Sequence, residues 1–210
     1  RMDAGDPAGA WKIWSDSKAT GNDPLADYPD IYRTAWSRIT QAAEDHNQPG
    51  QFTAFIGFEW TSNPGKNNLH RNVIFRGGKD TADTIIPFSN FDSFDPEDLW
   101  AWMQRYEQNT QDRLLAIPHN GNLSNGLMFD DVTLSSRKPL DADYAKRRMR
   151  WEPLYETTQM KGDGEAHPLL STDDEFADFE TWDKGQLGPK PKTPDMLPRE
   201  YARESLKRGL

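Results

Sequence analysis

Three side chains with metal-binding chemistry stand at the ends of short apolar segments. Glu59 closes the run 52–60 (FTAFIGFEW), His70 lies near the start of 69–75 (LHRNVIF), and His119 ends 113–119 (RLLAIPH). Imidazole and carboxylate ligands together suit Zn, Mn or Fe better than Ca or Mg. The alternative is that all three are ordinary polar ends of strands, because their spacing matches no compact motif such as HExxH.

The two remaining histidines have different surroundings. His167 follows Asp163 and Glu165 in the stretch KGDGEAHP. Three interpretations of this stretch stay open: it lines a pocket, it binds substrate, or it forms a solvated polar loop. His46 lies near the end of a predicted helix, where a partly cationic ring suits the helix dipole. We therefore interpret His46 as structural.

Helices are indicated by apolar spacing and by capping residues. Residues 29–47 carry apolar side chains at helical intervals, and the stretch 94–110 combines an N-cap at Asp95 with Pro96 at the first helical position. Residues 141–150 are predicted to be helical, and the chain closes with a helix within 193–209. Residues 1–30, rich in Gly, Pro and Asp, are interpreted as an irregular N-terminal segment.

Four strands are predicted between these helices, at 52–60, 69–75, 113–119 and 153–160. The run 52–60 is too short and too uniformly apolar for a surface helix, which is typical of a strand buried on both faces of a parallel sheet. Strands that alternate with helices favour an α/β fold with one largely parallel sheet. Glu59 and His119 then end their strands, and His70 follows a loop long enough to return to the same place. We predict that the three side chains converge on one polar pocket.

Composition narrows the class of protein. The chain has 210 residues, enough for one large domain, and a net charge of −9, which argues against non-specific binding of nucleic acid. It contains no cysteine, so neither disulfides nor thiolate sites can form. No apolar stretch approaches the roughly 20 residues of a membrane span. No signal peptide is visible, and since the sequence starts at Arg1 the localisation stays open.

Longer blocks resemble one bacterial family, the domain of unknown function 3604, which is itself similar to the PHP (polymerase and histidinol phosphatase) superfamily. The resemblance runs from about residue 30 to the end, so that 31–210 is expected to be the central part of a PHP-like domain. The blocks that carry it are FTAFIGFEWTS, NNLHRNVIFR, AIPHNGNLSNGLMF, WEPLYETTQMKGDGEAHP, DEFADFETWDKG and YARESLKRGL.

The resemblance implies a distorted (β/α) barrel with two or three divalent transition metal ions at its C-terminal face. Glu59 matches a carboxylate that bridges metals, and His70 and His119 match two histidine ligands, although Asn120 stands where the superfamily usually has proline. An early His-x-His, an Asp-His and a late Asp-x-His have no counterpart here. We therefore expect an incomplete metal site with weak metal binding, and either self-association or completion by another chain.

The function that follows from the resemblance is metal-dependent hydrolysis, most simply of a small-molecule phosphoester. Metal ions would activate water and clamp the phosphoester oxygens, with Glu59 and His119 in catalytic roles. Two alternatives stay open, namely hydrolysis of another ester or an amide, and a non-catalytic binding or structural module. Candidate substrate-binding residues are Arg71, Asn120, Asn122, Asp163, Glu165 and His167.

Overall fold

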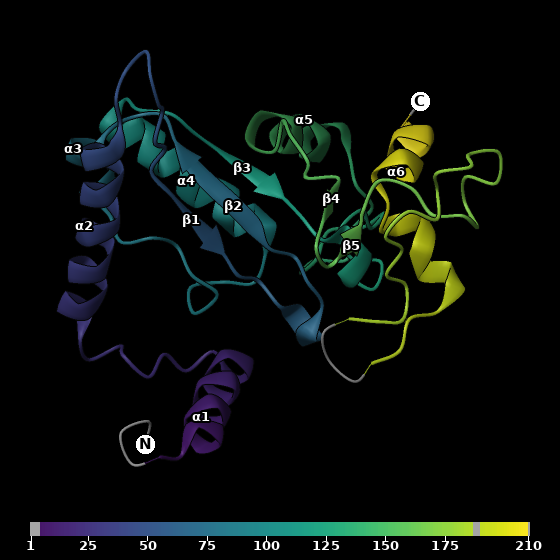
Figure 1. The fold of residues 1–210 in the computed structure, drawn as a ribbon, viewed down its shortest axis with the longest axis horizontal. Coiled ribbons are helices and arrows are strands. Elements are labelled where there is room, and N and C mark those ends of the chain that lie inside the picture. Colours follow the sequence, from purple (N-terminus) through teal and green to yellow (C-terminus); the bar gives the residue numbers. More distant parts are fainter. Residues whose placement is uncertain (1–4, 187–189, 210) are drawn as a thin grey trace.

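The computed structural model describes residues 5–186 and 190–209 of the chain (Figure 1). Among them, no helix is long and apolar enough to cross a membrane. The helices are α1 (Pro7–Thr20), α2 (Pro29–His46), α3 (Lys79–Ala82), α4 (Pro96–Thr110), α5 (Ala142–Trp151) and α6 (Ala202–Gly209). The strands are β1 (Gly57–Trp60), β2 (Arg71–Phe75), β3 (Leu114–Pro118), β4 (Thr158–Gln159) and β5 (Gly162–Asp163), and short 3₁₀ helices span Pro64–Lys66, Gly121–Leu123 and Pro194–Arg199.

The central sheet is antiparallel, with the strand order β1-β2-β3. The prediction of a largely parallel sheet in a PHP-like barrel is therefore wrong: the described residues form two small antiparallel sheets and no closed barrel. The connection from β1 to β2 explains this locally. A parallel pair needs a crossover of about a dozen residues or more, usually a helix, whereas residues 61–70 hold only the 3₁₀ turn Pro64–Lys66.

The uniform apolar character of 52–60 was the misleading signal. Only Gly57–Trp60 form a strand, and the side chains of Phe52 and Phe55 are exposed rather than buried between two layers. Along β2 and β3, buried residues alternate with partly buried ones. Such alternation is typical of an antiparallel sheet with one covered face.

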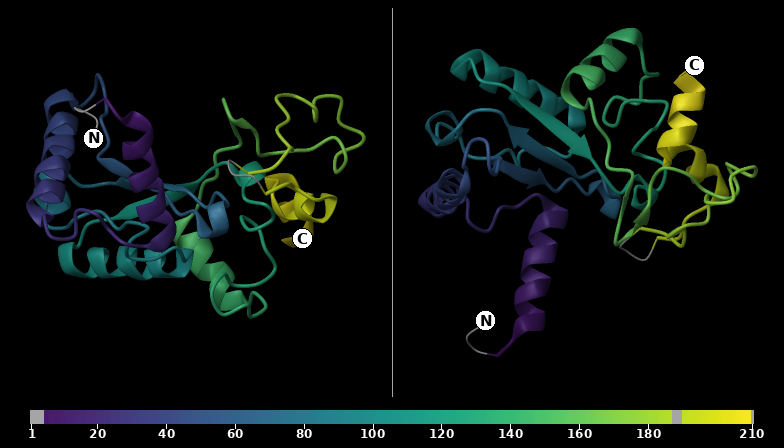
Figure 2. Two further views of the ribbon diagram at one scale, coloured as in Figure 1. Left: turned by 90° about the horizontal axis from the view of Figure 1, so that it is seen from below. Right: turned by 45° about the horizontal axis from the view of Figure 1, so that its top comes forward.

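The covered face packs against α4 and forms the hydrophobic core. Figure 2 shows α4 running along this side of the sheet. The core is rich in aromatic side chains, which bury a large area each. Its members are Trp36, Ile56, Trp60, Val73, Phe75, Ala82, Leu99, Trp100, Met103, Tyr106, Leu114, Ala116 and Trp151.

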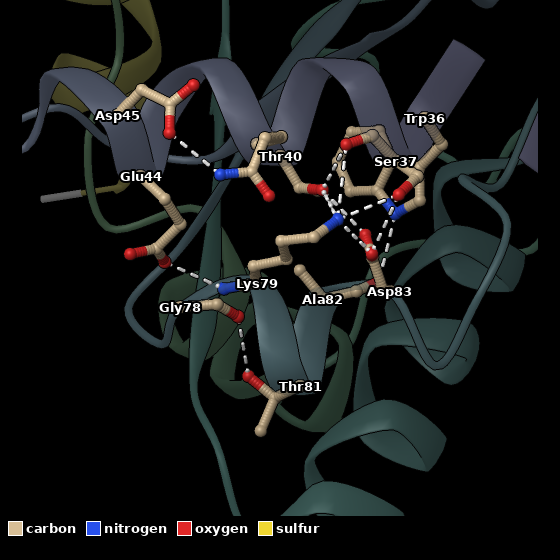
Figure 3. A network of polar contacts seen from close by, with 11 residues as sticks. Trp36, Ser37, Thr40, Glu44, Asp45, Gly78, Lys79, Thr81, Ala82 and Asp83 are labelled. Carbon is tan, nitrogen blue, oxygen red and sulfur yellow. Dashed lines mark hydrogen bonds and ion pairs between the residues drawn. The ribbon is translucent and has the colours of Figure 1, made fainter. Parts of the chain in front are cut away.

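A polar network fastens α2 to α3 (Figure 3). Lys79 Nζ donates to Ser37 Oγ at 2.7 Å and to Thr40 Oγ1 at 3.1 Å, and it forms an ion pair with Asp83. Trp36 Nε1 donates to the carbonyl of Ala82 at 2.9 Å. These bonds satisfy each partly buried polar group, so we assign this cluster to the packing of the two helices.

The helix predictions based on capping are confirmed. Helix α4 begins at Pro96 with Asp95 as N-cap, whose carboxylate accepts from the amide of Glu97 at 2.9 Å. Helix α2 occupies the segment predicted from apolar spacing, and α5 occupies the segment 141–150 that was predicted to be helical. Local sequence determines these elements because both the cap and the apolar stripe lie within one segment.

Three segments differ from expectation. Residues 1–30 are not wholly irregular, since α1 begins at Pro7 with Asp6 as its N-cap. The stretch 153–160 contributes only β4, which pairs with β5 in a short hairpin. The C-terminal segment divides into the 3₁₀ helix Pro194–Arg199, with Pro198 inside it, and α6. Proline removes a backbone donor, which disfavours one continuous helix there.

Candidate metal centre

The C-terminal ends of β1 and β3 lie beside the N-terminal end of β2, because β2 runs antiparallel to both strands. Glu59 pairs with Asn72, which in turn faces Ile117 on β3. His70 precedes Asn72 by two residues, and His119 follows Ile117 by two residues. Side chains two residues apart share a face of a sheet, so Glu59, His70 and His119 come together on the face opposite the core.

One oxygen of Glu59 is the centre of this group. Glu59 Oε1 lies 2.9 Å from His70 Nδ1 and 3.1 Å from His119 Nε2. One ligand atom from each residue lies within 4.8 Å of the others, and no other group of three such residues does so in the described part of the chain. The two imidazole rings stand edge to face, with centroids 5.8 Å apart. Both rings are buried, while the Glu59 side chain is 45% exposed, which leaves an approach from solvent.

A comparison with known protein families agrees with the family resemblance of the sequence blocks. The family described as "Protein of unknown function (DUF3604)" matches residues 12–210. The chain belongs to this family. No curated protein and no solved structure matches the chain. The description of DUF3604 names no activity, so its function has to be inferred from the site.

The carboxylate of this DUF3604 chain is held in its ionised form. Hydrogen bonds from His119 and His70 lower the pKa of Glu59 well below its usual range, against the opposing effect of burial. Burial lowers the pKa of His70, although the Glu59 carboxylate opposes that change. At neutral pH the site therefore offers one carboxylate and a neutral His70, the protonation states that bind a metal ion.

The hydrogen bonds of His70 leave a contact that a cation would resolve. His70 Nδ1 faces Glu59 Oε1 and Nε2 lies 2.9 Å from Asn63 Oδ1, whereas a neutral ring donates a proton from only one of its two nitrogens. In the tautomer that donates to Asn63, Nδ1 presents its lone pair to Glu59 Oε1 at 2.9 Å. A divalent ion between them turns both atoms into ligands, so the donor set fits a metal ion.

The loop after β3 presents His119 in an unusual backbone geometry. Asn120 has a φ of 53°, in the left-handed region, before the 3₁₀ turn Gly121–Leu123. Proline fixes φ near about −65°, so it could not take the place of Asn120 in this backbone conformation. Gly121 is required for space, because an added Cβ would lie 2.4 Å from the carbonyl oxygen of Glu200.

Asn120 and Asn122 closely follow His119 in the sequence, but their side chains have different surroundings. Both polar side-chain atoms of the buried Asn120 are without a hydrogen-bond partner among the described residues, as is Nδ1 of His119. The side-chain amide of Asn122 donates to the carbonyl of Lys161 at 3.0 Å. Asn122 therefore fixes a neighbouring segment.

The other residues predicted to bind substrate have structural partners elsewhere. Arg71 faces the core side of the sheet, where its guanidinium donates to the buried Glu152 at 3.0 Å. Asp163 accepts from the amides of Glu165 and Ala166, Glu165 pairs with Arg203, and His167 Nε2 lies 3.2 Å from Asp183 Oδ2. The structure does not bring these four residues into the Glu59 group.

Sequence reasoning missed the partner that orients His70. Asn63 Oδ1 lies 2.9 Å from Nε2 of the His70 ring, and Asn68 Oδ1 accepts from the His70 backbone amide at 2.9 Å. The signal was present in the stretch TSN that directly follows Glu59 and Trp60. Because β1 and β2 form a hairpin, the first residues after β1 lie opposite the last residues before β2.

Proposed function

We propose that Glu59, His70 and His119 hold a divalent transition metal ion in a metal-dependent hydrolase of phosphoesters. The observation that carries the proposal is the convergence of two buried imidazoles on one ionised, partly exposed carboxylate, with one ligand atom from each within 4.8 Å. Nitrogen and oxygen ligands in this combination suit Zn, Mn or Fe.

Each residue has a distinct part in the chemistry. Glu59 supplies negative charge and is the only member open to solvent, so it faces the position that water and substrate would take. His119 offers Nε2, which lies 3.1 Å from the same carboxylate oxygen, as a further ligand. With a metal ion bound, Asn63 would accept from His70 Nε2, which leaves Nδ1 free as a ligand. A bound metal ion would lower the pKa of water and stabilise negative charge on phosphoester oxygens.

Membership of the PHP superfamily is part of this proposal. The support is residue by residue: a carboxylate at a strand end and two histidines match the superfamily's metal ligands. The sheet observed here is antiparallel, so the proposal rests on the site and on no likeness of fold. Two or three ions in a complete centre would need ligands beyond the three residues that meet here.

Hydrolysis of a chromogenic phosphomonoester and phosphodiester tests the proposed activity. The purified chain is treated with chelator and then supplied with Mn²⁺ or Zn²⁺. We expect hydrolysis to depend on added metal and to be lost in Glu59→Gln and His119→Gln, but kept in Glu175→Gln, an exposed acidic residue outside the site. Metal binding without hydrolysis of either ester would contradict the proposed reaction and would favour a non-catalytic metal-binding module.

A further inference from the structure

A pocket along the outer edge of β1 includes Glu59 in its lining. Its walls come from α2, from the end of β1 with Thr61, and from the segment 86–90. Phe58 and Glu59 are neighbours in a strand and point to opposite faces, so a hollow lined by both lies along the strand's edge. That edge pairs with no other strand in the described part of the chain, and Figure 1 shows α2 on this side of the sheet. The pocket therefore adjoins the candidate metal centre through Glu59 itself.

The walls of this pocket are mainly apolar and rich in aromatic rings. Trp36 and Phe58 meet edge to face with their centroids 6.0 Å apart, and Phe88 stacks on Trp102 at 6.0 Å. These contacts within the protein fix the orientation of the rings, so the pocket is pre-formed. Ile39 of α2 also lines the pocket and is 52% exposed, so the pocket opens to solvent there. Aromatic rings favour such surroundings, because ring pairs add to the gain from burial.

The volume of the pocket, about 320 Å³, suits a small organic group. Ligand pockets typically measure about 300–1,000 Å³, and a cavity of about 150 Å³ already holds benzene. The pocket beside Glu59 therefore has room for one or two rings. A larger hollow beside Lys79 and Asp112 is lined only by polar residues and glycines, and it contains none of the three proposed metal ligands.

One buried polar side chain belongs to this pocket. Asn90 lines it and is only 7% exposed, yet its Nδ2 makes no hydrogen bond within the part of the chain that the structure describes. A buried donor without a partner is unfavourable. A ligand that carries an acceptor at this end of the pocket would gain a hydrogen bond there, in addition to its apolar contacts.

We propose that this pocket binds an aromatic group of the substrate beside the metal centre, so that the preferred substrates are esters of aromatic alcohols. The inference rests on the proposed function for the ester group, and it names the part of the substrate that the metal ion does not hold. Because Glu59 belongs to both the pocket and the metal centre, a ring in the pocket brings its attached ester oxygen towards the ion. Ile39 and the aromatic walls then determine specificity.

Binding of 2-naphthol, a neutral aromatic alcohol, tests the pocket without requiring catalysis. It is titrated by calorimetry into the metal-free 210-residue chain as wild type, Ile39→Gln and Ile31→Gln. Ile31 is the matched control because it lies on the same helix, is 48% exposed and is not among the lining residues. Glutamine is neutral, so the charge near Glu59 stays the same. We expect Ile39→Gln to weaken 2-naphthol binding about tenfold, while Ile31→Gln binds like wild type.

Paramagnetic Mn²⁺ tests whether the pocket adjoins the metal centre. When wild type holds both Mn²⁺ and 2-naphthol, the naphthol NMR signals should broaden because the ring lies close to the ion. The broadening should be lost in His119→Gln, which removes a proposed metal ligand. Hydrolysis with Mn²⁺ then tests specificity: Ile39→Gln should raise KM for 2-naphthyl phosphate and leave KM for glycerol phosphate unchanged.

The remaining outcomes separate this inference from the proposed function. Equal affinity of wild type and Ile39→Gln for 2-naphthol, or no binding, rejects the aromatic pocket. Bound Mn²⁺ that leaves the naphthol signals sharp rejects its place beside the metal centre, and equal changes in both KM values reject the aromatic specificity. Binding of 2-naphthol through Ile39 in a chain that hydrolyses neither ester leaves the pocket standing and rejects the proposed reaction. Circular dichroism checks that each variant is folded.

Discussion

Asn120 sits next to a proposed metal ligand in a backbone conformation that few residues adopt. Its φ of 53° and the unpartnered polar atoms of its side chain make the residue after His119 a specific requirement of this loop. Glycine and asparagine tolerate this region, whereas proline does not. The residue after His119 is therefore restricted by the backbone of this turn.

The conformation of Asn120 gives a stability prediction. We expect Asn120→Pro to lower the free energy of unfolding by about 3 kcal/mol or more, because proline cannot reach a positive φ. Asn120→Gly should change it by less than about 1 kcal/mol. Urea unfolding of the three proteins measures both values. An Asn120→Pro protein as stable as wild type would show that this loop adopts another conformation.

Glu59 gives a prediction about pH. Its pKa is lower in the folded chain than the ordinary value of about 4.3. A lowered carboxyl pKa stabilises the fold above that ordinary value, and the stabilisation is lost as the pH falls towards the folded-state pKa. Because the side chain is 45% exposed, we expect no more than about 1 kcal/mol from this group.

Unfolding free energies of the metal-free chain between about pH 6 and pH 3 measure this contribution. Wild type should lose more stability over this interval than Glu59→Gln, because the variant has no carboxylate to protonate. Equal losses in the two proteins would mean that His70 and His119 do not stabilise the Glu59 carboxylate.

At the scale of elements, the neighbouring residues His70 and Arg71 at the start of β2 lie on opposite faces of the sheet. His70 faces the candidate metal centre, whereas Arg71 faces the core and bonds to Glu152, itself held by Trp100 and Arg148. Adjacent residues in a strand point to opposite faces. The phosphate-binding role considered for Arg71 therefore has no geometric support, and its partner Glu152 lies far along the chain.

Breaking this buried pair should destabilise the fold. We expect Arg71→Met to lower the free energy of unfolding by about 3–5 kcal/mol, because Glu152 loses a buried partner. Asp143→Asn, which breaks an exposed pair with Lys146, should cost less than about 1 kcal/mol. Urea unfolding compares the two variants. A small effect of Arg71→Met would leave its guanidinium available for another role.

The sequence was informative where one segment carries its own signal. Caps and apolar stripes located α2 and α4. The polar residues at the ends of apolar runs led to the prediction that Glu59, His70 and His119 lie together. The three side chains lie together although the predicted strand direction was wrong, because a hairpin also brings the end of β1 to the start of β2. Strand direction and the contact of Asn63 with His70 depend on how separate segments pair, which periodicity within one segment does not encode.

At the scale of the whole molecule, one sheet face is covered by α4 and the other is not. Ile74, Leu115 and Ile117 lie on the second face and are only partly buried, and Phe55 nearby is 65% exposed. The outer edges of β1 and β3 also pair with no other strand among the described residues. Apolar surface and unpaired edges of this kind promote association.

We therefore expect the isolated chain to associate with itself in a concentration-dependent way. Sedimentation velocity over a range of concentrations measures this. Leu115→Lys, which places a charge on the uncovered face, should shift the distribution towards monomer, while Met149→Lys on the exposed side of α5 should not. A monodisperse monomer at all concentrations in wild type would contradict the expectation.

The central claim is that Glu59, His70 and His119 form a metal centre, and calorimetric titration with Zn²⁺ tests it most directly. Wild type, Glu59→Gln and the control Glu165→Gln are compared, because Glu165 is an acidic residue that the structure places with Arg203 instead. We predict that wild type and Glu165→Gln bind Zn²⁺ alike and that Glu59→Gln binds at least about tenfold more weakly, with unchanged circular dichroism. Equal affinity in all three proteins, or no Zn²⁺ binding by wild type, would contradict the metal centre and leave Glu59 and His70 as polar ends of two strands.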